Sequence, residues 1–343
     1  MRDVVDTIQT WLHAEHPVAL ATVVATWGSA PRQIGARMGI SDQLHMVGSV
    51  SGGCVETAVA HAALETLADG GHRLLTFGVA DDTAWEVGLA CGGQISVFVE
   101  PLDQIWWQVV AQQIVNDHAF ATALILEGPT AGLKVAVNAE SVIYSTLALP
   151  PEQRDALAAA ARAALVAGIP QRVSVGALDV FVDVYLPRPH LYIIGGAHVA
   201  MPLSVMARLL GFKVTLVDPR AAFATPERFP EVDAISHQYP DELFAASGLH
   251  SQSYIAILSH DPKIDDPALR VALPSNVPYI GILSSRQTHT RRLERLAAAG
   301  VDGALLHQIR TPIGLEIGAR TPEEIALAIM AEIVAVRNGA ARE

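Results

Sequence analysis

Cysteine is scarce in this sequence, which has two, Cys54 and Cys91, among 343 residues. Two cysteines cannot build the disulfide framework of a small secreted protein, and a reducing cytosol would not favour one. A structural zinc site also fits poorly, because the pair has no Cys-x-x-Cys spacing and no histidine at ligand spacing. We therefore expect each cysteine to react, to bind a ligand or simply to pack in a core.

Long apolar runs are missing as well. The longest apolar stretches, around Pro17–Trp27 and Ala156–Gly168, are too short, or too rich in alanine and interrupted by arginine, to cross a bilayer. Residues 1–6 carry two acids and lack the basic start and apolar block of a secretory signal. We expect a soluble cytoplasmic protein with no membrane partner.

Positive charge is in short supply, with 23 Lys and Arg against 35 Asp and Glu and a formal net charge of −12. Such a balance repels polyanions, and no basic cluster with interleaved aromatics offsets it, so nucleic acid is not an expected partner. Apolar residues are plentiful at 51%. A chain of this length and composition predicts two folded domains.

The stiff Pro187-Arg188-Pro189 stretch marks the expected boundary, which gives domains 1–186 and 187–343. The first domain is predicted to be mixed α+β, and no internal repeat stands out in it. Periodicity and turn residues predict helices at 4–13, 55–68 and 156–167 and strands at 18–26, 37–40, 45–50, 73–77, 94–99, 121–126, 134–137, 141–145 and 179–185.

The second domain alternates strand and helix, which predicts an α/β fold with a Rossmann-like, doubly wound parallel sheet covered by helices on both faces. The expected strands are 190–194, 213–217, 255–258 and 279–283, and the expected helices are 199–210, 267–273, 291–299 and 322–337.

A glycine loop follows the first of these strands. In the dinucleotide fingerprint Gly-x-Gly-x-x-Gly/Ala, the three positions are occupied here by Gly195, Ala197 and Ala200, with Gly196 between the first two. Asp218, at the end of the next strand, is placed where a carboxylate usually receives ribose hydroxyls. The Ala197 methyl weakens the pyrophosphate contact, so we expect NAD or NADP affinity on the order of 0.1 mM or weaker. A tight turn without ligand binding is the other interpretation.

Both cysteines lie beside paired glycines, in Ser51-Gly52-Gly53-Cys54-Val55-Glu56 and in Cys91-Gly92-Gly93. Cys54 is placed at the start of a predicted helix, where the helix dipole lowers a thiol pKa. Glycines leave open backbone of the kind that a bulky planar ligand needs. Cysteine is also a small buried hydrophobe in many cores, and that interpretation stays open.

Taken together, several stretches resemble the XdhC/CoxI family of accessory proteins for molybdenum hydroxylases such as xanthine dehydrogenase. These stretches occur in the family's order and are residues 21–32 (ATVVATWGSAPR), 48–56 (GSVSGGCVE), 91–93 (CGG), the Gly195 loop with His198-Val199, and 311–326 (TPIGLEIGARTPEEIA). The family loop usually reads Gly-Ala-Gly-His-Val, and this chain departs from it.

The resemblance implies a chaperone rather than an enzyme. It would bind the molybdenum cofactor (molybdopterin or its cytosine dinucleotide), hold it during sulfuration by a cysteine desulfurase and insert it into an apo molybdenum hydroxylase, as a homodimer. Cys54 and Cys91 would contact the molybdenum, and Glu56 would orient the polar edge of the cofactor. The expected cofactor-binding residues are Cys54, Cys91, Gly52, Gly53, Glu56, Gly92, Gly93, Gly195, Gly196, Ala197, His198 and Asp218.

Some residues have two interpretations. His198 could act on a bound phosphate or cap a helix, and Arg32 and Arg37 could bind a pterin phosphate or lie on a solvated surface. The adjacent pair Trp106-Trp107 could form a partner surface or pack within the first domain.

The motif at residues 314–324 also combines two kinds of signal. Thr321 and Glu324 predict a capping box before a helix, whereas Gly314 and Gly318 suggest that something approaches the loop closely.

Two other functions remain: an NAD(P)-dependent oxidoreductase, for which no acid/base pair is evident, and an interaction module that holds no cofactor.

For the chaperone, we expect the cofactor in a cleft between the domains, so that neither half alone binds it as tightly as the whole chain.

Overall fold

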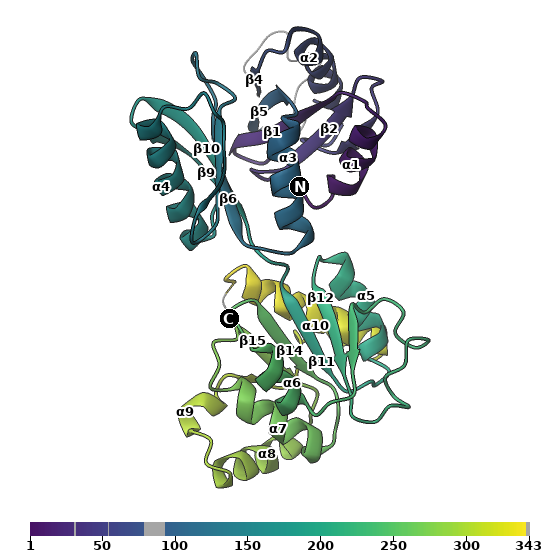
Figure 1. The fold of residues 1–343 in the computed structure, drawn as a ribbon. Coiled ribbons are helices and arrows are strands. Elements are labelled where there is room, and N and C mark those ends of the chain that lie inside the picture. The colour runs from purple at the N-terminus through teal and green to yellow at the C-terminus, as the bar shows by residue number, and fades with distance from the viewer. Residues whose placement is uncertain (31, 54, 79–92, 341–343) are drawn as a thin grey trace. The chain divides into compact units, whose positions relative to one another are not determined.

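The computed structural model describes residues 1–30, 32–53, 55–78 and 93–340. The chain divides into two compact units, Met1–Pro187 and Arg188–Glu343, and the division falls within the Pro187-Arg188-Pro189 stretch. Figure 1 shows the helices and strands of each unit. In the described ranges, no helix is long and apolar enough to cross a membrane.

The first unit contains two five-stranded antiparallel sheets, ordered β3-β2-β1-β5-β4 and β8-β7-β6-β10-β9. Its helices are α1 (Val5–His13), α2 (Glu56–Asp69), α3 (Gln104–Val115) and α4 (Pro151–Ala167). Its strands are β1 (Val18–Trp27), β2 (Arg37–Ser41), β3 (Met46–Gly48), β4 (Arg73–Phe77), β5 (Gln94–Pro101), β6 (Phe120–Ile125), β7 (Lys134–Val137), β8 (Val142–Ser145), β9 (Gln171–Val175) and β10 (Leu178–Tyr185).

These elements form an internal structural repeat that was not apparent from the sequence. The order α1-β1-β2-β3-α2-β4-β5 is followed by α3-β6-β7-β8-α4-β9-β10, and the two sheets correspond strand for strand. Corresponding residues flank the central strand at the same register: Thr22 with Arg37 and Phe98 in the first repeat, and Leu124 with Lys134 and Phe181 in the second. Several equivalent positions carry the same kind of residue: Phe98 and Phe181 match, Arg37 and Lys134 are both cations, and Glu100 and Asp183 are both acids.

The inner faces of the two sheets pack on each other around a small apolar cluster: Val24, Phe98, Leu124, Leu126 and Phe181. Two buried ion pairs cross between the repeats at equivalent places. Arg37 Nη1 lies 2.6 Å from Asp183 Oδ2, and Lys134 Nζ lies 2.6 Å from Glu100 Oε2. In each pair the cation begins the second strand of one repeat and the acid lies on the last strand of the other. The first unit is thus built as a fused pair of similar modules.

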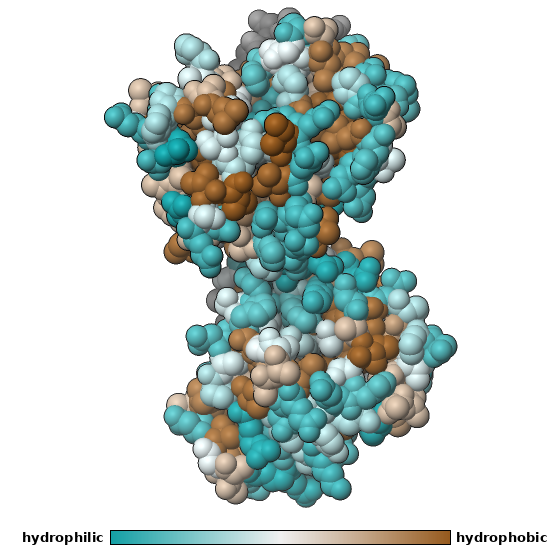
Figure 2. All heavy atoms as spheres, in the orientation of Figure 1, coloured by the Kyte–Doolittle hydropathy of each residue, from teal (hydrophilic) through white to brown (hydrophobic). Residues whose placement is uncertain are grey.

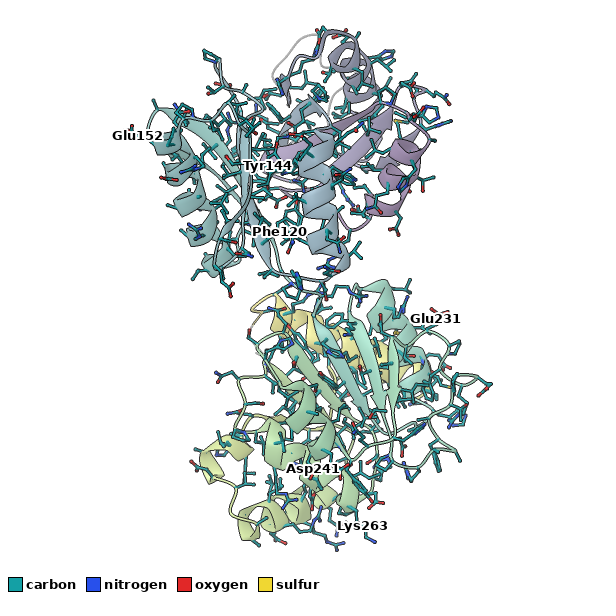
Figure 3. All side chains as sticks on the ribbon, viewed as in Figure 1. Phe120, Tyr144, Glu152, Glu231, Asp241 and Lys263 are labelled. Atoms are coloured by element: carbon teal, nitrogen blue, oxygen red, sulfur yellow. The ribbon has the colours of Figure 1, made fainter. Side chains whose placement is uncertain are left out.

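Helices cover the outer faces of this pair. α2 packs over the first sheet and α4 over the second. α3, for which the sequence predicted no range, buries Trp106 and Trp107 (2% and 1% exposed), so the interpretation of these residues as a partner surface is wrong. Figure 3 shows Phe120 and Tyr144 among the packed side chains of this unit, whereas Glu152 points outward.

The second unit is a Rossmann fold, as predicted, with parallel strands in the order β13-β12-β11-β14-β15-β16. The strands are β11 (His190–Ile194), β12 (Lys213–Val217), β13 (Ala234–Ser236), β14 (Ser253–Ile257), β15 (Tyr279–Ile282) and β16 (Ile309–Arg310). The helices are α5 (Ala200–Leu209), α6 (Pro240–Ser247), α7 (Pro262–Ala272), α8 (Arg286–Ala298), α9 (Gly303–Leu306) and α10 (Pro322–Arg337).

Helices lie on both faces of this sheet. Helices α5 and α10 lie on one face, and α6, α7 and α8 lie on the other (Figure 1). Side chains from each group pack in the apolar cluster on its own face. The Asp261 side chain caps α7, so this helix begins before Pro267, the first residue of the predicted helix, and contains that proline. Helix α10 begins with the predicted capping box of Thr321 and Glu324.

Candidate functional site

Three connections of the first repeat emerge at one edge of its sheet. β1 ends at Trp27 and β3 ends at Gly48, and both strands run the same way because each is antiparallel to β2. β5, antiparallel to β1, begins at that edge with Gln94. Trp27, Gly48 and Gln94 therefore lie at the same edge of the sheet, and motif stretches singled out in the sequence follow or precede these strand ends along the chain.

Contacts among the described residues bind these connections together. Gly93 is buried, and a Cβ built on it would lie 2.3 Å from the Ser29 carbonyl oxygen and 3.0 Å from that of Trp27, so a side chain cannot be accommodated. Ala30, Val50 and Val55 also belong to one apolar cluster beneath the three connections. The structure thus brings Gly93 to the Trp27–Ser29 turn.

Glu56 organises the connection between β3 and α2. Its carboxylate accepts hydrogen bonds from Ser49 Oγ (2.8 Å), from the Ser51 N–H (2.9 Å) and from the Gly53 N–H (2.7 Å). Burial alone would raise the pKa of Glu56, but these hydrogen bonds outweigh it and lower that pKa. Gly52 and Gly53 are exposed, and among the described residues no atom other than those of its chain neighbours lies within 4 Å of a Cβ built on Gly53. Glu56 therefore shapes the loop, and its two glycines add no side chains to the exposed surface.

The second repeat lacks these elaborations. Its β9 and β10 are joined directly through residues 176–177, whereas the equivalent connection in the first repeat runs from 78 to 93. Cys54, Cys91 and Gly92, the other expected ligands at this edge, lie outside the described residues. Both cysteines thus belong to connections of the first repeat, and Cys91 to the one that is much longer than its counterpart. Trp27, 74% exposed at the same edge, was assigned no role from the sequence.

Arg37 does not face this edge as a surface cation. It is 4% exposed, donates to Asp183 and contacts the hydroxyl of Tyr185. Both sequence interpretations of Arg37, phosphate binding and a solvated surface, are therefore wrong, because its partner on β10 draws it into the core. Arg32 is half-buried and lies 3.6 Å from Asp3.

In the second unit, the glycine loop makes the expected turn between β11 and α5. Gly195 has φ +101°, and a Cβ on it would lie 2.7 Å from the Ser259 nitrogen. A Cβ on Gly196 would lie 2.3 Å from the Phe223 carbonyl oxygen. Protein backbone thus already makes the close approaches that these glycines permit. His198 is exposed after the loop.

The Asp218 carboxylate is fully buried and already accepts four hydrogen bonds. They come from the Gly196 N–H (2.9 Å) and from the N–H, Nε and Nη2 of Arg220 (3.0, 2.9 and 2.8 Å). Burial would raise the pKa of Asp218, but the Arg220 and Gly196 donors outweigh it and keep the pKa low. The protein itself therefore occupies the carboxylate that the sequence assigns to ribose hydroxyls.

A cavity of about 410 Å³ opens at the carboxyl ends of β11, β12 and β14. This is the point where the strand order of a doubly wound sheet reverses and where such sheets bind ligands. Its lining comprises Ala197, Arg220, Phe223, Leu258, Ser259, His260, Asp261 and Pro262.

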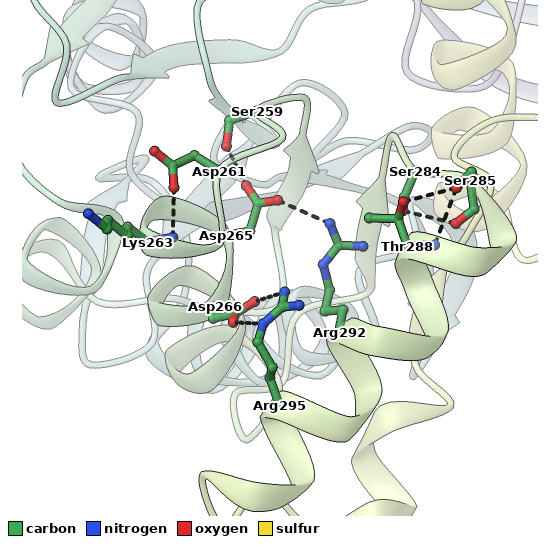
Figure 4. Close-up of polar contacts among 10 residues, drawn as sticks. All are labelled: Ser259, Asp261, Lys263, Asp265, Asp266, Ser284, Ser285, Thr288, Arg292 and Arg295. Atoms are coloured by element: carbon green, nitrogen blue, oxygen red, sulfur yellow. Dashed lines mark hydrogen bonds and ion pairs between the residues drawn. The ribbon is translucent and has the colours of Figure 1, made fainter.

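One wall of this cavity rests on buried charges, which Figure 4 shows. Ser259 donates to Asp265, and Asp265 Oδ2 lies 3.1 Å from Arg292 Nη2. Burial raises the pKa of Asp265, although Ser259 and Arg292 oppose that shift. Asp266 and Arg295 form a second pair beside them at 2.6 Å. These contacts tie α8 to α7 and fix the position of Ser259.

The loop at residues 311–319 lines another cavity, of about 590 Å³. Gly314 packs on α10, where a Cβ would lie 2.9 Å from the Ala328 carbonyl carbon, and its N–H donates to Glu332. Helix α10 therefore accounts for the glycine at this position. No atom lies within 4 Å of a Cβ on Gly318.

No group of three or more His, Cys, Asp or Glu side chains that could hold a metal ion occurs in the part of the chain that the structure describes. The expected contact of Cys54 and Cys91 to a cofactor metal falls on undescribed residues.

Comparison with known proteins gives two family matches. The model of the XdhC and CoxI family matches residues 11–78, and that of the XdhC Rossmann domain matches residues 191–333. Together they cover more than half of the chain.

The chain also resembles individual proteins along most of its length. It is 26% identical over 333 residues to a protein of Bacillus subtilis (strain 168) named as a probable subunit of xanthine dehydrogenase, covering 95% of each chain. It is 27% identical over 319 residues to the "molybdenum cofactor insertion chaperone PaoD" of Escherichia coli (strain K12), covering 93% of this chain and 83% of that protein.

A crystal structure described as a xanthine dehydrogenase from Bacillus halodurans superposes with a TM-score of 0.79 at 23% identity, covering 98% of this chain and 96% of that one. The two proteins therefore share a fold.

Proposed function

The chain belongs to the XdhC and CoxI family, and from this premise we propose that it is a cytoplasmic chaperone that carries the molybdenum cofactor to a xanthine dehydrogenase-type hydroxylase. The cofactor is cargo, in its molybdopterin or cytosine dinucleotide form. One observation supports the proposal above the others: the strand ends that adjoin the motif stretches, Trp27, Gly48 and Gln94, lie at one edge of the first repeat's sheet.

We place the cofactor at this edge. Cys54 and Cys91 supply sulfur ligands for its metal end, which suits a soft thiolate. Gly52, Gly53 and Gly92 keep side chains out of the space that a planar ring system needs, whereas Gly93 serves the site by letting the backbone pack against the Trp27–Ser29 turn. Glu56 acts through the loop, because its carboxylate already holds Ser49, Ser51 and Gly53.

The partners follow from the proposed cargo. A cysteine desulfurase would supply the terminal sulfur while the chaperone holds the cofactor, and the apo hydroxylase would receive it. A homodimer is the proposed assembly. A carrier needs no acid/base pair, which agrees with our assignment of the chain as an accessory protein rather than an enzyme. The relative named as an insertion chaperone supports this role.

The test is anaerobic loading with molybdenum cofactor, followed by oxidation and measurement of the fluorescent pterin that stays with the protein. We expect Cys54→Ser and Cys91→Ser each to lower retained pterin at least tenfold without changing the circular dichroism spectrum. Leu147→Ser is the matched control, because Leu147 is fully exposed in the connection between β8 and α4. This connection is the second repeat's counterpart of the one that contains Cys54.

Unfolding of both cysteine variants would support packed core cysteines instead. Wild-type protein that retains no pterin yet forms a stable complex with the apo hydroxylase would replace the carrier by an interaction module.

A further inference from the structure

The cavity at the carboxyl ends of β11, β12 and β14 is not used by the proposed cofactor site. Its walls include the apolar side chains of Ala197, Phe223, Leu258 and Pro262, which suit a flat heteroaromatic base. Arg220 contributes a cation at the same cavity, and the Asp261 carboxylate, which also lines it, accepts the Lys263 N–H at the start of α7. An apolar slot with a cation beside it is the arrangement expected for a nucleotide.

The Asp218 carboxylate, which would bind the hydroxyls of an unmodified ribose, is not accessible to a ligand. Asp218 is fully buried, and its oxygens accept the N–H of Gly196 and the N–H, Nε and Nη2 of Arg220. A ribose diol that replaced these donors would leave Arg220 without its partner. The preference for free hydroxyls found in ordinary dinucleotide sites is therefore not expected here.

Arg220, unlike Asp218, is available to a ligand and would attract a negatively charged group. Its side chain is 42% exposed and its guanidinium carbon lies 4.3 Å from the centre of the Phe223 ring. Because Asp218 holds Nε and Nη2, the guanidinium plane is fixed and the Nη1 edge is left for a ligand. A guanidinium held in this way can still donate from Nη1 to a phosphate oxygen.

The usual phosphate position is obstructed as well. The Phe223 carbonyl oxygen would lie 2.3 Å from a Cβ on Gly196, and Arg228 donates to the carbonyl oxygens of both residues, at 2.6 Å from Phe223 and 3.1 Å from Gly196. This clamp holds the chain after β12 against the glycine loop. A pyrophosphate above Gly196 therefore has less room than in a standard site, and Arg220 offers the more accessible cation.

We propose that this cavity binds a nucleotide whose ribose carries a 2′-phosphate, with the base in the apolar slot and the phosphate on Arg220. The site is independent of the cofactor edge in the first unit. Two ligands have a base and a phosphate group in common: a free phosphorylated adenine nucleotide and the cytidine diphosphate tail of a dinucleotide cofactor. The ligand proposed here is the free adenine nucleotide.

The test is calorimetric titration of the full chain with 2′-AMP, 5′-AMP and CDP. We expect 2′-AMP to bind at least tenfold more tightly than either of the others, and NADP to bind at least tenfold more tightly than NAD. Arg220→Ala should abolish both preferences. Arg208→Ala is the control, because Arg208 has the same side-chain exposure (42%) and lies on α5 beside Asp233, away from the cavity lining.

Since Arg220→Ala leaves Asp218 buried without its cation, the double variant Asp218→Asn/Arg220→Met is measured too, and it should fold and show no preference. Tighter binding of CDP than of 2′-AMP would overturn the proposal and assign the cavity to a cofactor tail. Equal binding of 2′-AMP and 5′-AMP, or a preference that survives in the double variant, would also overturn it. None of these outcomes bears on pterin retention at the cysteine edge.

Discussion

At the scale of single residues, buried polar groups in this chain owe their state to partners that lie close in space. His190, the first residue of β11, shows the effect for a titratable group. Its ring stacks on Tyr192 with centroids 4.0 Å apart, and its Nε2 lies 2.8 Å from Thr215 Oγ1. Burial first, then the nearby charges of Lys213 and His250, lower the pKa of His190 to about 4.

This shift predicts a pH-dependent stability of the second unit. In the unfolded chain the pKa of a histidine is near 6.5. Between pH 6.5 and 4, His190 is therefore protonated in the unfolded state but largely neutral in the folded state. The free energy of unfolding is therefore unaffected by protonation of His190 above pH 6.5, and it decreases as the pH falls from 6.5 toward 4. The decrease amounts to about 3 kcal/mol. Urea unfolding between pH 7.5 and 4 measures it.

His190→Asn should flatten this dependence, whereas His307→Asn, a change at an exposed histidine of the same unit, should not. A pH profile of the His190 variant that matches the wild type would contradict the assignment.

At the scale of elements, α10 illustrates a boundary set by local chemistry. Thr321 accepts a hydrogen bond from the Glu324 N–H at 3.3 Å, and the Glu324 carboxylate accepts from the Thr321 N–H at 3.0 Å. Pro322 follows at the first helical position. The helix buries Ile329, Met330 and Ile333 against the sheet, so fraying of its first turn reaches the core.

We therefore expect Thr321→Ala to lower the free energy of unfolding of the second unit by about 1 kcal/mol, the usual cost of losing an N-cap. Thr321→Ser keeps the hydroxyl and should restore most of it. Chemical denaturation of the three proteins provides the measurement, and an alanine variant as stable as the serine variant would show that the cap contributes nothing.

At the scale of the whole molecule, the boundary of cooperative folding should follow the two compact units and not the two repeats. Separating the repeats would leave Arg37 and Glu100 in one fragment and their partners, Asp183 and Lys134, in the other. An unpaired buried charge costs several kcal/mol. The Phe98 and Phe181 faces would also be exposed to water.

The prediction is that fragments 1–187 and 188–343 each fold with a cooperative urea transition, whereas fragment 1–102 stays unfolded. Circular dichroism and denaturation of the three fragments test this. A cooperative transition in fragment 1–102 would mean that one repeat is self-sufficient. Cofactor titration of the two folding fragments then shows whether the first unit alone reaches the affinity of the full chain.

The surface at this scale is polar over most of the face seen in Figure 2, with apolar patches on both units. Glu231 and Lys263 point outward from the second unit in Figure 3. With a net charge of −12, such a surface favours partners with basic or neutral contact faces.

The sequence by itself determined the features that depend on neighbours along the chain. The strand and helix alternation after Pro189 predicted the Rossmann unit, and the capping box of α10 was readable because its two residues are three apart. The motifs around Cys54 and Cys91, together with the stretches 21–32 and 311–326 and the Gly195 loop, indicated the family, because they are read from neighbouring residues and occur in the family's order.

Only the tertiary structure decided what depends on distant partners. The repeat in the first unit is defined by strand pairing. The few alike residues, such as Phe98 and Phe181, lie far apart along the chain and are recognised as equivalent only once the strands are paired. Arg37 is buried because Asp183 lies across the inner faces, 146 positions along the chain. Asp218 is closed to ribose because the fold turns Arg220 back onto it and brings Gly196 against it. The sequence does not distinguish a charged residue on the surface from one in the core. Its role depends on which protein groups replace water around it, and the fold decides that.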